Sequence, residues 1–245
     1  MFLSTVREII VINPKCLTQY IQNLMPLYLA QSNHAEEYIR NIVAESIGKL
    51  FITHPQELTP FISTAFSSND VNTVATYAKS FKYSAHNNEQ PQYFAQFIMN
   101  LIQLIGNSDL SVKRYSLESL SMIFYNIQFR PILEDKVQQV IEITLRETPV
   151  KQELITAVDL GPFKYNVDNG APIRKAAFVL LENVTEKYIN FDQGPVVDVV
   201  IKGFADKNED VQQQCLRFMN RLLIVCPNIV IDQLEQLVEK MQAIY

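Results

Sequence analysis

The residues that could carry acid–base or nucleophilic chemistry lie scattered along this chain of 245 residues. His34, His54 and His86 stand apart from one another, and none belongs to an HExxH pattern or lies beside a nucleophile motif. The sequence also lacks the patterns GxSxG, GxGxxG and GxxxxGK[ST]. Acidic pairs such as Glu36–Glu37 fall at expected helix starts, where carboxylates favour the helix dipole. We therefore expect no enzyme, no metal, no cofactor and no small-molecule substrate.

The number of cysteines and the net charge limit the cellular compartments and the partners that we expect for this chain. Cys16, Cys215 and Cys226 are odd in number, far apart and without a CxxC pair, which is typical of reduced thiols. The 21 basic and 26 acidic side chains leave a net charge of -5, and no basic face emerges for nucleic acid. Apolar runs such as residues 222–226 are far shorter than the ~20 residues of a membrane span. We expect a cytoplasmic and nuclear protein that binds neither nucleic acid nor membrane.

Helical periodicity runs through nearly the whole sequence. Apolar residues spaced by three and four mark residues 38–51, 112–124, 173–184 and 211–225, and each stretch follows Asn, Asp, Ser or Gly residues that can cap a helix. The segments between them open with a proline, which suits the first turn of a helix. These prolines are Pro14, Pro55, Pro91, Pro131, Pro195 and Pro227. The alternation predicts pairs of helices.

The pairs recur with a regular period. The apolar marker of the expected capped helices is Ile39, then Val71 or Val74, then Val112, Ile173 and Val211. The steps are 32–35, 38–41, 61 and 38 residues. Such a period approaches the roughly 40 residues of HEAT repeats, which stack because one helix pair cannot bury its apolar face alone. We therefore predict an all-α fold, a single α-solenoid of about six HEAT repeats over residues 1–245. Residues 1–12 would be a second helix and residues 229–243 a first helix, as in part of a longer solenoid.

The exceptional step separates Val112 from Ile173 by 61 residues, so about 23 residues must project from the stack. Two runs in this interval alternate between apolar and polar residues around Gly161-Pro162, which predicts a β-hairpin over about residues 152–169. It would protrude, within residues 150–170, between the two helices of one repeat. Because an isolated hairpin is marginal in water, its apolar face must lie on the solenoid or on a partner.

A family resemblance appears in the same stretch. The tract GPFK…VDNG…IRKAAF within Val150–Phe178, together with IRNIVAESIGKL upstream, closely resembles the C-terminal part of the cullin-associated and neddylation-dissociated family, also called TATA-binding-protein-interacting protein 120. A weaker likeness runs from about Val6 to Met241. The resemblance implies a HEAT protein that wraps cullin scaffolds of ubiquitin ligases, and whose hairpin reaches the cullin's N-terminal region, where the adaptor and substrate receptor dock. It also implies competition with that module and exchange of substrate receptors.

The hairpin and the basic pair that follows it are the expected partner-binding residues: Val158, Asp159, Leu160, Gly161, Pro162, Phe163, Lys164, Tyr165, Asn166, Val167, Asp168, Arg174 and Lys175. A second interpretation stays open for each group. Phe163 and Tyr165 could rest on the solenoid, and the recurring basic residues could form a ladder with acids of their own or the neighbouring repeat. That ladder would consist of Arg40, Lys113, Arg114, Arg174 and Lys175.

The alternative function is a generic HEAT scaffold, such as a karyopherin-like carrier or a phosphatase scaffold. Those proteins also bind partners on a concave surface, but their identity would not depend on the inserted hairpin.

Overall fold

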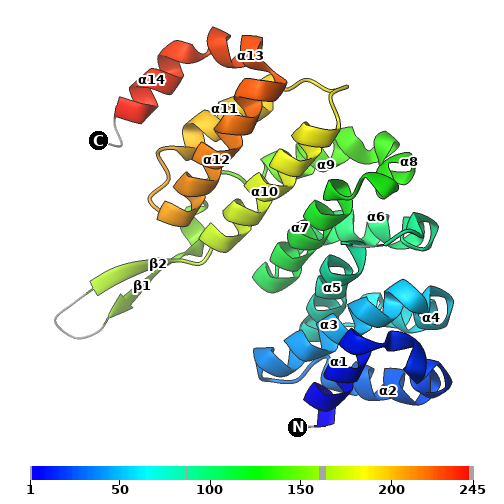
Figure 1. Ribbon diagram of the computed structural model, residues 1–245. Helices are drawn as coiled ribbons and strands as arrows, with labels where there is room; N and C mark the ends of the chain where they lie inside the picture. Colours follow the sequence, from blue (N-terminus) through cyan, green and yellow to red (C-terminus); the bar gives the residue numbers. More distant parts are fainter. Residues whose placement is uncertain (1, 87, 160–163, 243–245) are drawn as a thin grey trace. The chain divides into compact units, whose positions relative to one another are not determined.

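The computed structural model describes residues 2–86, 88–159 and 164–242. The chain divides into two compact units, residues 1–133 and 134–245, and in each of them helix follows helix (Figure 1). The described residues contain one small sheet of two strands, in the second unit. The prediction of an all-α repeat fold with one inserted β-hairpin is therefore confirmed.

The first unit is built in two layers. The second helix of each repeat packs on the second helices of its neighbours, so that α3 packs between α1 and α5, and α5 packs between α3 and α7. The first helices pack against them, α4 on both α3 and α5, and α6 on α7. The second helices are α1 (Phe2–Ile12), α3 (Glu37–Thr53), α5 (Val71–Ala85) and α7 (Leu110–Tyr125). The first helices are α2 (Ile21–Gln31), α4 (Pro55–Phe66) and α6 (Ala95–Leu104). Short helical segments complete the unit: the 3-10 helices η1 (Pro14–Tyr20), η2 (Pro91–Tyr93) and η3 (Ile127–Phe129), and the α-helix α8 (Arg130–Leu133).

The start signals act largely as the sequence predicts. Helices α4 and α13 begin at their prolines, and Pro195 is the second residue of α11. Asp70 accepts a hydrogen bond from the Thr73 amide, and Asp109 accepts bonds from two amides at the start of α7. The expectation of side-chain caps is wrong for α3 and α10, which begin after Glu36 and Gly170 without one. In α10 a proline in the first turn removes one of the amides that a cap would satisfy.

Close helix contact and aromatic packing form the core of the first unit. The Phe51 ring meets the rings of Phe81 and Phe94 edge-on, with centroids 5.7 and 5.2 Å away. This is the geometry that aromatic quadrupoles favour. At Gly48 a Cβ atom would lie 2.3 Å from the carbonyl oxygen of Ser80, so α3 and α5 touch backbone to backbone. A glycine is required there by the close approach.

The second unit repeats the scheme around the hairpin. Helix α10 packs on α9 and α12, and α11 packs on α12 and α14. The elements are η4 (Glu134–Lys136), α9 (Val137–Leu145), η5 (Gln152–Leu154), β1 (Ile155–Asp159), β2 (Lys164–Asp168), α10 (Ala171–Lys187), α11 (Gly194–Gly203), α12 (Glu209–Val225), α13 (Pro227–Asp232) and α14 (Leu234–Gln242). The helix expected over residues 229–243 is thus divided at Gln233.

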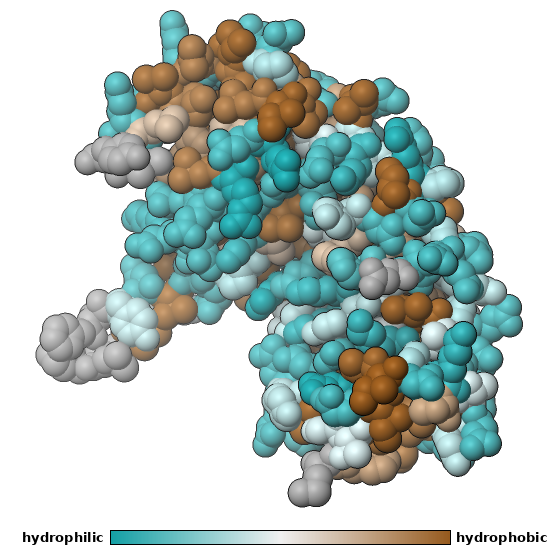
Figure 2. All heavy atoms as spheres, in the orientation of Figure 1, coloured by the Kyte–Doolittle hydropathy of each residue, from teal (hydrophilic) through white to brown (hydrophobic). Residues whose placement is uncertain are grey.

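Hydrophobic side chains gather on the surface around α13 and α14 (Figure 2). Ile224 is 74% exposed and Ile231 is 60% exposed, and Leu234, Val238 and Met241 are also exposed. Among the described residues, no helix combines the length and the apolar character that crossing a membrane requires.

Candidate protein-binding site

The inserted hairpin consists of β1 and β2, which pair antiparallel. Ile155 pairs with Asp168 at the base of the hairpin, and Asp159 pairs with Lys164 at its far end. Figure 1 shows the two strands extending away from the N-terminal end of α10. Four predicted site residues, Leu160, Gly161, Pro162 and Phe163, lie outside the described residues, and so does the predicted turn.

The register sorts the hairpin side chains onto two faces, because alternate residues of a strand point to opposite sides. One face, which we call the apolar hairpin face, carries Thr156, Val158, Tyr165 and Val167. The opposite face carries Ile155, Ala157, Asn166 and Asp168. Tyr165 is 49% exposed, and Val158 and Val167 are half-buried. A half-exposed aromatic ring flanked by aliphatic side chains is the kind of anchor that protein interfaces use.

Hydrogen bonds from Asn169 close the base of the hairpin. Its backbone amide donates to the carbonyl oxygen of Leu154 at 3.1 Å. Its side-chain Nδ2 donates to the same oxygen at 3.2 Å and to Oγ1 of Thr156 at 3.1 Å. Asn169 therefore satisfies backbone and side-chain acceptors of the incoming segment at the point where the outgoing strand turns into α10.

A buried arginine lies beside this base. The Arg174 side chain in the first turn of α10 is 2% exposed. Its Nε and Nη2 atoms donate to Asp206 at 2.7 and 2.8 Å, and its Nη1 and Nη2 atoms donate to Asp168 at 3.2 and 2.7 Å. We call these three residues the Arg174 cluster. Burial alone would lower the pKa of Arg174, but hydrogen bonds to both carboxylates outweigh it and raise that pKa. The hydrogen bond from Arg174 lowers the pKa of Asp168.

The two basic candidates differ in exposure. The guanidinium of Arg174 donates to acids of the hairpin and of the next repeat, which favours the ladder interpretation over direct contact with a partner. Lys175 leaves 45% of its side chain exposed, and its Nζ lies 3.0 Å from Oδ2 of Asp210 at the start of α12. The ladder therefore includes Lys175 as well, although much of this lysine is still accessible.

The expected ladder is uneven in the first unit. Arg114 donates to Glu118 of its own helix at 2.7 Å, and Lys82 of α5 donates to the same carboxylate at 2.9 Å. Arg40 instead donates to the backbone carbonyls of His34 and Ala35, at 2.6 and 2.9 Å. Glu118 thus pairs with Arg114 of its own helix and with Lys82 of the neighbouring repeat, whereas Arg40 stabilises the loop that precedes its own helix.

The sequence-based prediction missed one polar link across the second helices. Tyr115 lies in the range 112–124, where the sequence predicts an apolar helix face, yet its hydroxyl group donates a hydrogen bond to Glu37 of α3. Lys79 of α5 lies between them, with its Nζ 4.1 Å from the centroid of the Tyr115 ring and 4.0 Å from Oε1 of Glu37. The aromatic ring of Tyr115 fits the apolar period of the helix. Its hydroxyl group is the only feature of the residue that could have indicated a polar partner.

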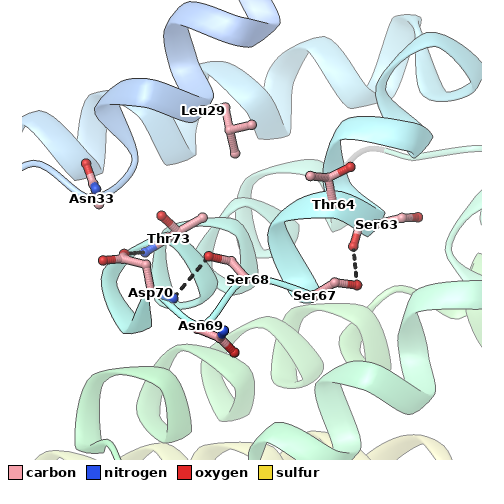
Figure 3. A pocket seen from close by; sticks show the side chains of 9 residues that line it. All are labelled: Leu29, Asn33, Ser63, Thr64, Ser67, Ser68, Asn69, Asp70 and Thr73. Carbon is pink, nitrogen blue, oxygen red and sulfur yellow. Dashed lines mark hydrogen bonds between the residues drawn. The ribbon is translucent and has the colours of Figure 1, made fainter.

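A shallow pocket in the first unit offers little chemistry (Figure 3). It is lined by Leu29, Asn33, Ser63, Thr64, Ser67, Ser68, Asn69, Asp70 and Thr73. Its polar groups already bind one another: Asp70 accepts from the Thr73 amide at 2.7 Å, and the Ser68 hydroxyl oxygen accepts from the Asp70 amide at 3.0 Å. Within the described ranges, no group of three or more His, Cys, Asp or Glu side chains is placed to hold a metal ion.

Comparisons with known proteins match the hairpin region and the fold. A family model described as "TIP120: TATA-binding protein interacting (TIP20)" matches residues 132–245. The "Cullin-associated NEDD8-dissociated protein 1" of Dictyostelium discoideum is 30% identical over 254 residues, covering 100% of this chain. The protein of the same name from Arabidopsis thaliana is 28% identical over 225 residues, covering 89% of this chain. The chain spans 20% and 18% of the length of these two relatives.

The fold itself resembles a karyopherin. The crystal structure of Kap121p bound to RanGTP aligns with 97% of this chain and 25% of its own, with a TM-score of 0.74 and 12% sequence identity. At that identity the likeness shows the fold alone.

Proposed function

Residues 132–245 of this chain belong to the TIP120 family, and from this premise we propose that the chain is a non-enzymatic cullin-binding protein. In the proposal it competes with adaptor and substrate-receptor modules at the N-terminal region of a cullin and so promotes their exchange. The names of the full-chain relatives support association with cullins. This chain spans about a fifth of the length of those relatives, so any activity that it shares with the whole relative is part of the proposal.

The observation that carries the proposal is the apolar hairpin face. It lies inside the segment matched by the family model, and it exposes half of Tyr165 instead of burying it in the helical core. When a partner covers an exposed aromatic ring on a projecting element, burial of the ring stabilises the complex. We therefore assign contact with the cullin to this face, with Lys175 as the nearby exposed charge.

Competition would follow from overlap of two ligands on the cullin. If the hairpin binds a surface of the cullin that the adaptor also binds, each ligand weakens the binding of the other by the same coupling free energy. Exchange is faster than simple dissociation only when a short-lived ternary complex forms. No cofactor takes part in such a mechanism.

The test compares four versions of the chain in cullin binding and in adaptor release, three to test the hairpin and one as a control. One is the parent, one has residues 156–167 replaced by a short Gly/Ser link, and one carries Tyr165→Ser. Asn166→Ser is the matched control, because Asn166 is the exposed neighbour on the opposite face. We expect Tyr165→Ser to weaken cullin binding by about thirtyfold, as for a central interface anchor, and Asn166→Ser to leave it unchanged.

Two results would contradict the proposal. Absence of any cullin binding by the parent chain would refute cullin association. Adaptor release that is equally fast with the Gly/Ser link would refute the role of the hairpin. A pull-down from cell extract tests the alternative carrier or phosphatase-scaffold function, which predicts Ran or a phosphatase subunit in place of cullin.

Location in the cytoplasm and nucleus is part of the same proposal. Cys16 is exposed and unpaired, and Cys215 and Cys226 are also free thiols, as expected in reducing compartments. Imaging of a fluorescent fusion tests the location, and retention in the secretory pathway would exclude it.

A further inference from the structure

The side chain of Asp168 connects the end of strand β2 to the start of helix α10. This carboxylate ends the strand, binds Arg174 in the first turn of the helix, and accepts a hydrogen bond from the Gly170 amide at 3.0 Å. A Cβ atom at Gly170 would lie 3.1 Å from Cδ1 of Leu154 and 3.3 Å from Nη1 of Arg174, so the connection is tightly filled. The link between hairpin and helix is therefore short, closely packed and held by polar contacts on the hairpin side.

The opposite side of the Arg174 cluster holds the arginine itself. Asp206 is 5% exposed and lies in the loop between α11 and α12. Its carboxylate accepts hydrogen bonds from Nε and Nη2 of Arg174, which fixes the plane of the guanidinium group. Asp206 is held in turn, because its Oδ1 accepts from the Asn208 amide at 2.9 Å. Bidentate pairing of a planar guanidinium with carboxylates constrains direction as well as distance. The hairpin base is thus connected through Arg174 to the neighbouring repeat.

A structural role for helix packing alone does not need Asp168. Arg174 and Asp206 already link α10 to the loop that precedes α12. The carboxylate of Asp168, 24% exposed at the end of β2, adds to this link the hydrogen bonds that connect the hairpin to the first turn of α10. A two-stranded hairpin with no further strand is marginal and free to change direction without such a support. Holding a binding element in its bound direction reduces the entropy lost on association.

We propose that the Arg174 cluster fixes the direction in which the hairpin leaves the second unit, with Arg174 and Asp168 as positioning residues for the apolar hairpin face. The inference rests on the proposed function for its partner, a cullin, but the orientation itself can be measured without one.

The experiment measures a distance distribution by pulsed electron spin resonance. Spin labels are attached at Ala157→Cys on β1 and Gln213→Cys on α12, both exposed positions, in a chain whose exposed native thiol is removed by Cys16→Ser. Asp168→Asn cuts the link to the hairpin, and Arg174→Lys keeps the charge but loses the planar fork. Lys175→Gln is the matched control, since it breaks the adjacent ion pair with Asp210 without touching the hairpin.

We expect a narrow distribution in the parent and in Lys175→Gln, and one about twice as wide in Asp168→Asn and Arg174→Lys. Asp168→Asn also loses the stability that its ion pair contributes, so the widths are compared at a temperature at which all four chains are folded. Equal widths in all four chains would overturn the positioning role.

Cullin affinity completes the test and separates the two proposals. Asp168→Asn should weaken cullin binding by about tenfold through the lost preorganisation, while the contacts of Tyr165 remain. If the Gly/Ser link abolishes binding but Asp168→Asn leaves it unchanged, the positioning inference is wrong and the proposed function stands. If the Gly/Ser link itself has no effect, the proposed function is wrong, whatever the width of the distance distribution.

Discussion

The hydroxyl group of Tyr115 on α7 donates a hydrogen bond of 2.7 Å to Oε1 of Glu37 on α3, past the intervening helix α5. The bond joins repeats that are not adjacent in the stack. It lowers the pKa of Glu37, and burial together with this bond raises the pKa of Tyr115. Burial lowers the pKa of Lys79, which lies over the Tyr115 ring, and the nearby acids Glu118 and Glu37 only partly offset that effect.

Tyr115→Phe should lower the free energy of unfolding by about 1 kcal/mol, the usual contribution of one hydrogen bond. The ring would keep its packing, and only the link to Glu37 would be lost. Chemical denaturation measures the change. Tyr38→Phe is the control, because Tyr38 is 62% exposed. Equal effects of the two substitutions would contradict the prediction.

Acid should weaken the anchorage of the hairpin. The pKa of Asp168 is lowered in the folded chain, so its contribution to stability is present above the pKa of the unfolded carboxyl, near 4, and is lost as pH falls through the folded value. The difference in unfolding free energy between the parent and Asp168→Asn should therefore shrink between about pH 5 and pH 2. A difference that stays constant over this range would show that the ion pair adds no stability.

Thiol labelling should detect one fast cysteine. Cys16 is exposed, whereas Cys215 and Cys226 are buried, and burial raises the pKa of Cys215 to about 12. Because the thiolate is the reactive form, iodoacetamide at neutral pH should modify Cys16 first and the other two only on unfolding. Mass spectrometry of labelled peptides measures the order. Early labelling of Cys215 would contradict the described packing of α12.

Gly48→Ala should destabilise the first unit, although alanine favours helix by up to about 1 kcal/mol. The added methyl group would lie 2.3 Å from the carbonyl oxygen of Ser80 and 2.7 Å from Cβ of Tyr83, so α3 and α5 would have to separate, at a cost of about 1–3 kcal/mol. Gly106→Ala is the control, because its methyl group would meet only the Gln103 carbonyl oxygen, at an ordinary 3.4 Å. Thermal unfolding of the two variants decides the matter, and a higher midpoint for Gly48→Ala would refute the close approach.

Local signals in the sequence were enough to predict the elements. Prolines and capping residues determine where a helix can start, the apolar period determines its buried side, and the excess length before Ile173 required a projection. Each signal depends on residues within a few positions of one another, or on a repeat that the chain copies. For that reason the helix pairs and the two strands could be predicted without coordinates.

Tertiary structure alone decided which polar groups meet. From the sequence, Arg174 could belong either to the ladder of ion pairs or to a contact with a partner. Its burial between Asp168 and Asp206 depends on Asp206, which is 32 positions away. Tyr115 and Glu37 are 78 positions apart, in a pairing that no local period encodes. Such contacts depend on how one repeat is turned against the next, and that rotation arises from the packing of whole helix faces.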